Sequence, residues 1–250
     1  MRKMNERTRM CAAFSVLTAI GFLLRYLQLA TGYDADGLPL PGAGVLLGVF
    51  SVGVAAAAAL YCRKLQDRTS CEEAFSFSMP TAIASFAGAG LILAGCLTDL
   101  SASGLDKVSA LLGIVSALVI VAQQGALYNN KTMHPMIGMI PIAFYIVRLI
   151  CDFKQWSTDP IILDYWVKLF AMLAILLASY YCGGFAINKG KRGVTVFFCL
   201  MAVFFSVLSL ADGGTEFSLI AGGSMLWEGA CGWQLLRPDE APAEEQTPEE

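Results

Sequence analysis

Residues 108–128, VSALLGIVSALVIVAQQGALY, decide the fold class of this chain. The stretch is rich in Val, Ile and Leu and carries no charged side chain. About 20 predominantly apolar residues are needed for a helix to cross the hydrocarbon core of a bilayer. A helix also pairs its own backbone polar groups, which lipid cannot do. The stretch therefore predicts a transmembrane helix.

The composition of the whole chain agrees with this prediction. Of its 250 residues, 56% are hydrophobic and only 15% are charged, whereas a soluble domain carries about 25% charge. These values exclude a soluble globular enzyme and a disordered chain. The net charge of −3 and the lack of a long basic run exclude a nucleic-acid binder. We expect an all-α, polytopic membrane helical bundle whose main partner is the lipid bilayer.

Eight stretches are long and apolar enough to be spans, and together they define a transmembrane domain over residues 1–237. The first, fifth and eighth are the least regular, because each contains a charge or helix-breaking residues. The predicted spans are 10–31, 42–62, 79–98, 108–128, 134–151, 161–182, 193–211 and 217–236.

The distribution of Lys and Arg predicts the orientation. Basic residues concentrate on the cytoplasmic side of membrane proteins. With a cytoplasmic N-terminus, twelve bases fall on the inside, and only Lys107 and Lys154 fall on the outside. We therefore expect both termini to be cytoplasmic. The twelve are Arg2, Lys3, Arg7, Arg9, Arg63, Lys64, Arg68, Lys131, Lys189, Lys191, Arg192 and Arg237.

Two segments are predicted to lie in the cytoplasm outside the spans. Residues 238–250 hold six of the chain's 20 acids among Pro and Ala, which is typical of a disordered acidic tail. Residues 63–78 place Glu72 and Glu73 beside Phe75 and Phe77, which is typical of an amphipathic anchor at the interface. A binding site for a cytoplasmic protein, at 63–78 or on the tail, is the alternative interpretation.

Charged residues inside predicted spans form an outer layer. Charge in the bilayer core is costly, so such residues are where function would be found. Arg148 and Asp152 are four residues apart, as are Asp164 and Lys168, so each pair shares a helix face. Together with Arg25 they suggest an outward-facing polar vestibule, where Arg25, Arg148 and Lys168 meet an anionic group of a solute. The alternative is that each base snorkels to the interface or pairs with a neighbouring acid.

An inner polar layer consists of Gln123, Gln124 and Glu228. A glutamate at that depth must be protonated, paired or in contact with water. It would act as a proton-coupling carboxylate or a cation ligand. The alternative is one interhelical hydrogen bond, to a Gln or to Tyr180 or Tyr181.

A short internal similarity raises the hypothesis of a parallel duplication of four helices. Residues 22–25 read FLLR and residues 145–148 read YIVR, an offset of 123 residues. Such a 4+4 repeat would place both arginines near a common axis.

The usual enzyme and metal motifs are missing from the sequence. It contains no HExxH, GxSxG or Walker motif, and His134 is its only histidine. None of the eight cysteines forms CxxC, so they are interpreted as small buried hydrophobic residues. We expect no enzymatic activity, no cofactor and no metal site.

Residues 23–42, LLRYLQLATGYDADGLPLPG, resemble the first outer loop of uncharacterised multi-pass membrane proteins of gut Firmicutes. The resemblance implies a bacterial cytoplasmic membrane and no particular activity.

Two functions remain open at this point. One is a small-solute transport or solute-binding component, whose charged residues would line a shared cavity. The other is a sensor or accessory protein that acts through its cytoplasmic loop and tail, with its charges paired locally in a tightly packed bundle.

Overall fold

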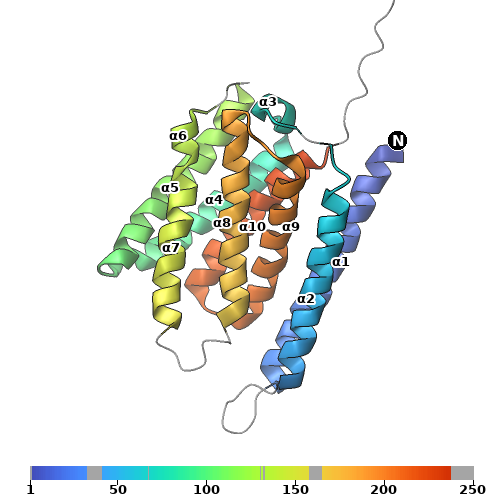
Figure 1. Ribbon diagram of the computed structural model, residues 1–250. Coiled ribbons are helices and arrows are strands. Elements are labelled where there is room, and N and C mark those ends of the chain that lie inside the picture. Colours follow the sequence, from blue (N-terminus) through green and yellow to red (C-terminus); the bar gives the residue numbers. More distant parts are fainter. Residues whose placement is uncertain are drawn as a thin grey trace, which may run out of the picture.

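The computed structural model describes residues 2–32, 41–66, 68–129, 131, 133–157 and 165–237. Every regular element in these ranges is a helix (Figure 1). The all-α prediction is therefore confirmed for this part of the chain. The predicted tail 238–250 and Asp164 lie outside the described residues.

The long helices follow the predicted spans closely. The 3-10 turns η1 (Asp99–Ser101), η3 (Phe185–Ile187) and η4 (Leu210–Asp212) and the short helices α3 (Cys71–Ala74) and α6 (Pro135–Gly138) flank them. The long helices are α1 (Arg2–Thr31), α2 (Pro41–Cys62), α4 (Met79–Thr98), α5 (Leu105–Tyr128), α7 (Ile140–Trp156), α8 (Trp166–Gly184), α9 (Arg192–Ser209) and α10 (Thr215–Leu235).

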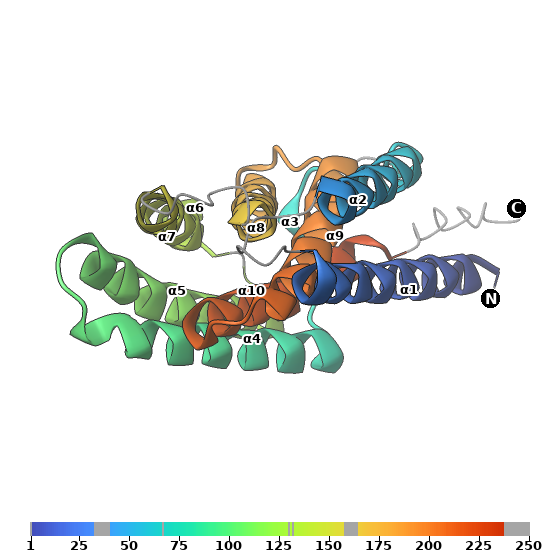
Figure 2. The same cartoon turned by 90° about the horizontal axis from the view of Figure 1, so that it is seen from below.

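Seven of the long helices are apolar and long enough to cross a membrane, and α10 is not among them. The predicted count of eight spans is thus supported for seven. The helix α10 contains Gly222, Gly223 and Glu228, and it packs against α4, α8 and α9 (Figure 2). Because its neighbours cover most of its surface, α10 does not need the continuous apolar surface of a lipid-facing helix.

Apolar side chains cover the outside of the bundle. On α2, Leu46, Val49 and Val52 are 58%, 67% and 70% exposed. The α1–α2 pair lies at one edge of the molecule and packs mainly on α9 (Figures 1 and 2). Many exposed apolar side chains on one surface are unfavourable in water and suit a lipid environment. This surface supports the membrane assignment independently of the composition.

A glycine contact brings α4 and α10 together. A Cβ atom added to Gly88 would lie 2.5 Å from the carbonyl oxygen of Gly223, and one added to Gly223 would lie 2.5 Å from that of Gly88. Small residues at a contact allow two helices to approach this closely.

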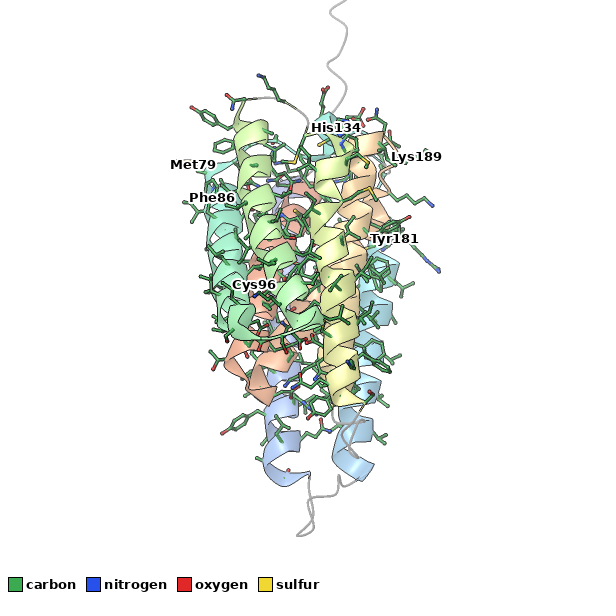
Figure 3. The ribbon with its side chains drawn as sticks, turned by 90° about the vertical axis from the view of Figure 1, so that its left-hand side faces the viewer. Met79, Phe86, Cys96, His134, Tyr181 and Lys189 are labelled. Atoms are coloured by element: carbon green, nitrogen blue, oxygen red, sulfur yellow. The ribbon has the colours of Figure 1, made fainter. Side chains whose placement is uncertain are left out.

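The fifth predicted span divides at its prolines. Pro135 begins α6 and Pro141 lies in the first turn of α7, where a missing N–H is tolerated. The Nδ1 atom of His134 accepts a hydrogen bond from the backbone N–H of Met136 at 3.3 Å and so caps α6. Figure 3 shows His134 and Lys189 at the same end of the bundle. We call this the His134 end.

The segment 63–78 lies at the His134 end and is attached to the bundle. It forms only one helical turn, α3. Phe75 is buried with its ring 5.3 Å from that of Phe185, and Phe77 lies 5.1 Å from Tyr128. Both phenylalanines therefore contact other helices, and the position of this segment at the membrane interface stays a prediction.

Candidate functional sites

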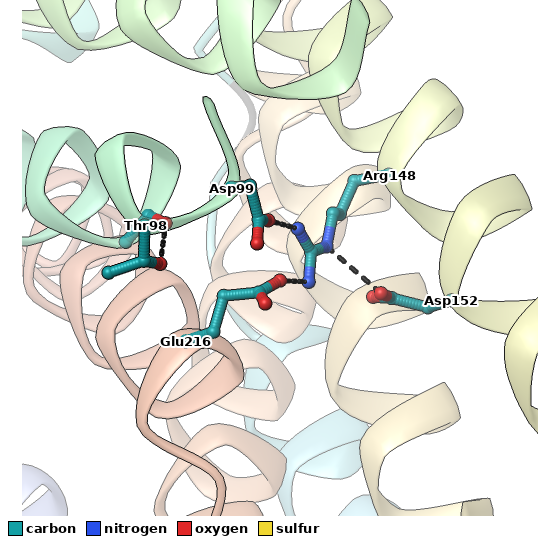
Figure 4. Close-up of polar contacts among 6 residues, drawn as sticks. Thr98, Asp99, Arg148, Asp152 and Glu216 are labelled. Atoms are coloured by element: carbon teal, nitrogen blue, oxygen red, sulfur yellow. Dashed lines mark hydrogen bonds and ion pairs between the residues drawn. The ribbon is translucent and has the colours of Figure 1, made fainter. Parts of the chain in front are cut away.

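Arg148 on α7 is the centre of a polar cluster built from three helical segments. Its Nη1 atom donates to Asp99 at 2.5 Å, and Nη2 donates to Glu216 (Figure 4). The Nε atom lies 3.0 Å from a carboxylate oxygen of Asp152 one turn along α7, as the sequence spacing predicted. The cluster therefore ties the end of α4 and the start of α10 to α7.

Arg25 forms a separate ion pair. Its Nε atom donates to Asp212 in η4 at 2.6 Å, and its Nη1 atom donates to Gln28 at 3.0 Å. Arg25 is only 1% exposed. The structure therefore gives Arg25 and Arg148 different partners, and the duplication suggested by FLLR and YIVR stays a prediction.

Lys168 on α8 lies beside the Arg148 cluster. Its Nζ atom is 5.5 Å from the centre of the Phe217 ring and 5.7 Å from that of Tyr165, which is within cation–π range. Its predicted partner Asp164 is outside the described residues, so that pairing stays a prediction.

Two open depressions adjoin the Arg148 cluster. The first, of about 880 Å³, includes Lys168, Trp156 and Phe217 in its wall. The second, of about 760 Å³, includes Asp106 and Lys154. Arg148, Asp152 and Glu216 line both, whereas Arg25 lines neither. The open depressions thus lie around Arg148 and not around Arg25.

Acids outnumber the base in this cluster. Three carboxyl groups face one guanidinium, so Arg148 remains neutralised even when one carboxyl is protonated. An anion would have to displace a carboxylate from Arg148, at the cost of leaving a buried charge unpaired. The cluster is therefore better suited to a cationic group than to the anion that the three bases suggested.

Glu228 on α10 is fully buried in the second polar site. Its Oε1 atom accepts a hydrogen bond from Ser179 Oγ on α8 at 2.6 Å. Its Oε2 atom lies 3.6 Å from the sulfur of Cys199 on α9 and 3.8 Å from that of Cys182 on α8. Within the described part of the chain, no lysine or arginine forms an ion pair with it. The expected Gln, Tyr180 or Tyr181 partner is replaced by a serine and thiols.

The other two residues of the predicted inner site lie on α5. Gln124 is buried, and its Oε1 atom has no hydrogen-bond partner among the described residues. Gln123 lines a narrow cleft of about 50 Å³ that begins near His134 and reaches Ser179 and Cys182. This cleft connects the neighbourhood of Glu228 with the His134 end.

Cys71 also lines this cleft. Burial and the neighbouring carboxylate of Glu72 raise the pKa of the Cys71 thiol above its usual value. Cys71 is therefore a neutral thiol near pH 7 rather than a reactive thiolate.

Sequence analysis missed Ser179 and the cysteines around Glu228, because they belong to three helices and share no spacing motif. It also missed Arg192, which caps the end of α10 by donating to the carbonyl oxygen of Leu235 at 2.7 Å.

No protein-family model, curated protein or solved structure matches the chain.

Proposed function

We propose that this chain is an integral protein of a bacterial cytoplasmic membrane that binds a small, positively charged solute, as a transport or solute-binding component rather than an enzyme. The His134 end would face the cytoplasm, together with both termini, and the depressions around Arg148 would face outward. The distribution of basic residues and the resemblance of residues 23–42 support this location.

The observation that carries the proposal is the surplus of carboxyl groups over basic groups at the wall of the second depression. Asp99, Asp152 and Glu216 already neutralise Arg148, and Asp106 adds a further acid in the second depression. In the first depression the Lys168 ammonium lies over the Phe217 ring, so removal of this lysine would free aromatic surface for an organic ammonium group.

The proposal predicts opposite effects for two charge-removing variants. Purified full-length protein in detergent would be titrated with agmatine, choline and spermidine, with acetate and phosphate as anionic probes, while thermal unfolding is followed. Glu216→Gln is expected to weaken cation binding several-fold, and Lys168→Met to strengthen it. Glu72→Gln removes an exposed acid on α3, away from the Arg148 cluster, and is the matched control. Stabilisation by the anions, or weaker cation binding by Lys168→Met, would overturn the proposal.

A second function has its own supporting observation. Arg25 and Arg148 are both paired locally, as expected for a sensor or accessory protein that acts through residues 63–78 and its tail. Proteoliposomes separate the two functions. Uptake of a bound cation that Glu216→Gln abolishes would establish transport. Binding without uptake would favour the sensor or accessory function.

A further inference from the structure

Three cysteines from three different helices gather around Glu228. They are Cys182 on α8, Cys199 on α9 and Cys231 on α10, helices that lie side by side in Figure 1. The sulfur atoms of Cys182 and Cys231 and a carboxylate oxygen of Glu228 all lie within 4.8 Å of one another. The sulfur atom of Cys199 lies outside that group of three but is 3.6 Å from Oε2 of the same glutamate. All three cysteines are free of disulfide bonds.

Two sulfur–oxygen distances at Glu228 are close to those of a four-coordinate metal site. With Zn–S bonds of about 2.3 Å and a Zn–O bond of about 2.1 Å, tetrahedral angles place sulfur and oxygen ligands roughly 3.6 Å apart. The sulfur atoms of Cys199 and Cys182 lie 3.6 and 3.8 Å from Oε2 of Glu228. Cys182 and Cys199 therefore already lie at ligand–ligand distance from this oxygen.

The surroundings of Glu228 also favour a bound cation. A buried carboxylate is costly unless it is neutralised by a proton, a base or a metal ion. Within the described residues, its hydrogen-bond partners are a hydroxyl and thiols, none of which is positively charged. Ser179 holds Oε1 and leaves Oε2 directed toward the sulfurs, as an outer-shell residue does in metal sites.

The cleft from the His134 end supplies a route to the cluster. Its mouth includes Met133 and His134, whose sulfur and imidazole groups bind the same metals, and its inner wall includes Cys182. Trp227 also lines it, and the buried Nε1 atom of this residue has no partner among the described residues.

We propose that Cys182, Cys231 and Glu228, with Cys199 beside them as a fourth donor, form a membrane-buried site for a thiophilic divalent cation of the zinc type, loaded from the His134 end. Sulfur ligands select such metals over magnesium and calcium, and the carboxylate favours a divalent ion over copper(I). Each thiol that binds the ion releases its proton to solvent as the metal–sulfur bond forms. This site uses different residues from the solute site around Arg148, so either proposal can fail alone.

Cadmium provides the direct test, because thiolate coordination gives an ultraviolet charge-transfer band. Reduced, full-length protein in detergent is expected to bind one Cd²⁺ with this band, and Zn²⁺ should displace it. Cys182→Ser, Cys199→Ser and Cys231→Ser should each reduce the band, and the triple variant should lack it. Glu228→Gln should weaken binding about tenfold or more while keeping the Ser179 contact. Cys96→Ser, an equally buried cysteine on α4, is the matched control.

A second measurement uses only wild-type protein, so it remains informative if the variants do not fold. In the wild-type protein, Zn²⁺ should slow alkylation of Cys182, detected by mass spectrometry, and leave Cys11 unaffected. The proposal is overturned if wild-type protein shows no cadmium–thiolate band and no protection of Cys182. It is equally overturned if the band survives in the triple variant or disappears in Cys71→Ser alone.

Discussion

The Arg148 cluster and the Glu228 cluster place polar groups inside an apolar bundle in opposite ways. Arg148 forms ion pairs with three carboxylates and borders open depressions. Glu228 is fully buried and is matched by neutral hydroxyl and thiol groups. The first arrangement balances charge with charge, whereas the second leaves one carboxyl whose neutralisation depends on a proton or a metal ion. Loss of charge from the Arg148 cluster should therefore cost the most stability, whereas loss of Glu228 should mainly weaken metal binding.

The largest expected effect is the loss of the guanidinium. Arg148→Met leaves three neighbouring carboxyl groups without their base, which should destabilise the fold by about 3–5 kcal/mol. Thermal unfolding in detergent would measure this loss. Lowering the pH should restore part of it, because protonation removes the repulsion among the carboxylates. Lys154→Met, at an exposed position on the same helix, should unfold as wild type. Wild-type stability of Arg148→Met would show that the cluster is not a structural ion-pair network.

A smaller loss of stability is expected when the contact between Gly88 and Gly223 is disturbed. This contact positions α10, which contributes residues to both clusters. Gly223→Ala would place a methyl group against the backbone of Gly88 and Ile92, so the helices must separate at a cost of about 1–3 kcal/mol. This variant should also lower cadmium binding, because Glu228 and Cys231 shift with α10.

Gly222→Ala is the matched control for that variant, because no other atom lies within 4 Å of the added Cβ position. Unfolding temperature and cadmium affinity would be measured for both variants. Equal behaviour of the two alanines would show that the Gly88–Gly223 contact does not set the position of α10.

The smallest effects should distinguish the two glutamates. Glu216→Gln weakens one partly exposed ion pair, which should cost less than about 1 kcal/mol. Glu228→Gln keeps a hydrogen-bond acceptor for Ser179 and should leave the metal-free unfolding temperature nearly unchanged. Added Zn²⁺ should then raise the unfolding temperature of Glu216→Gln but not that of Glu228→Gln. A large destabilisation of metal-free Glu228→Gln would show that this carboxylate is structural.

Much of the fold could be predicted, because a helix that crosses lipid needs a continuous stretch of about 20 apolar residues. Apolar length alone located all the long helices, and Met79–Thr98 agrees with its predicted bounds at both ends. The i, i+4 spacing of Arg148 and Asp152 was sufficient to place those two side chains together. The assignment of α10 as a span was less secure, because burial by protein and burial by lipid favour similar residues.

The sites were predicted in part. Sequence analysis selected Arg148, Lys168 and Glu228 as polar residues inside spans, since charge in a bilayer is unusual wherever it occurs. It grouped Arg25 with Arg148, and the structure separates them, because sequence gives the depth of a residue but not its direction around the bundle. Depth alone therefore cannot tell which charges meet.

The sequence by itself determined that this chain is an apolar, helical protein with a few charged residues inside its helices. Only the tertiary structure decided which side chains meet, because contacts among α8, α9 and α10 depend on helix rotation and crossing. In the sequence, the scattered positions of Cys182, Cys199 and Cys231 favour their interpretation as buried hydrophobic residues. In the folded protein they surround one carboxylate, and that arrangement supports a metal site that no sequence spacing predicted.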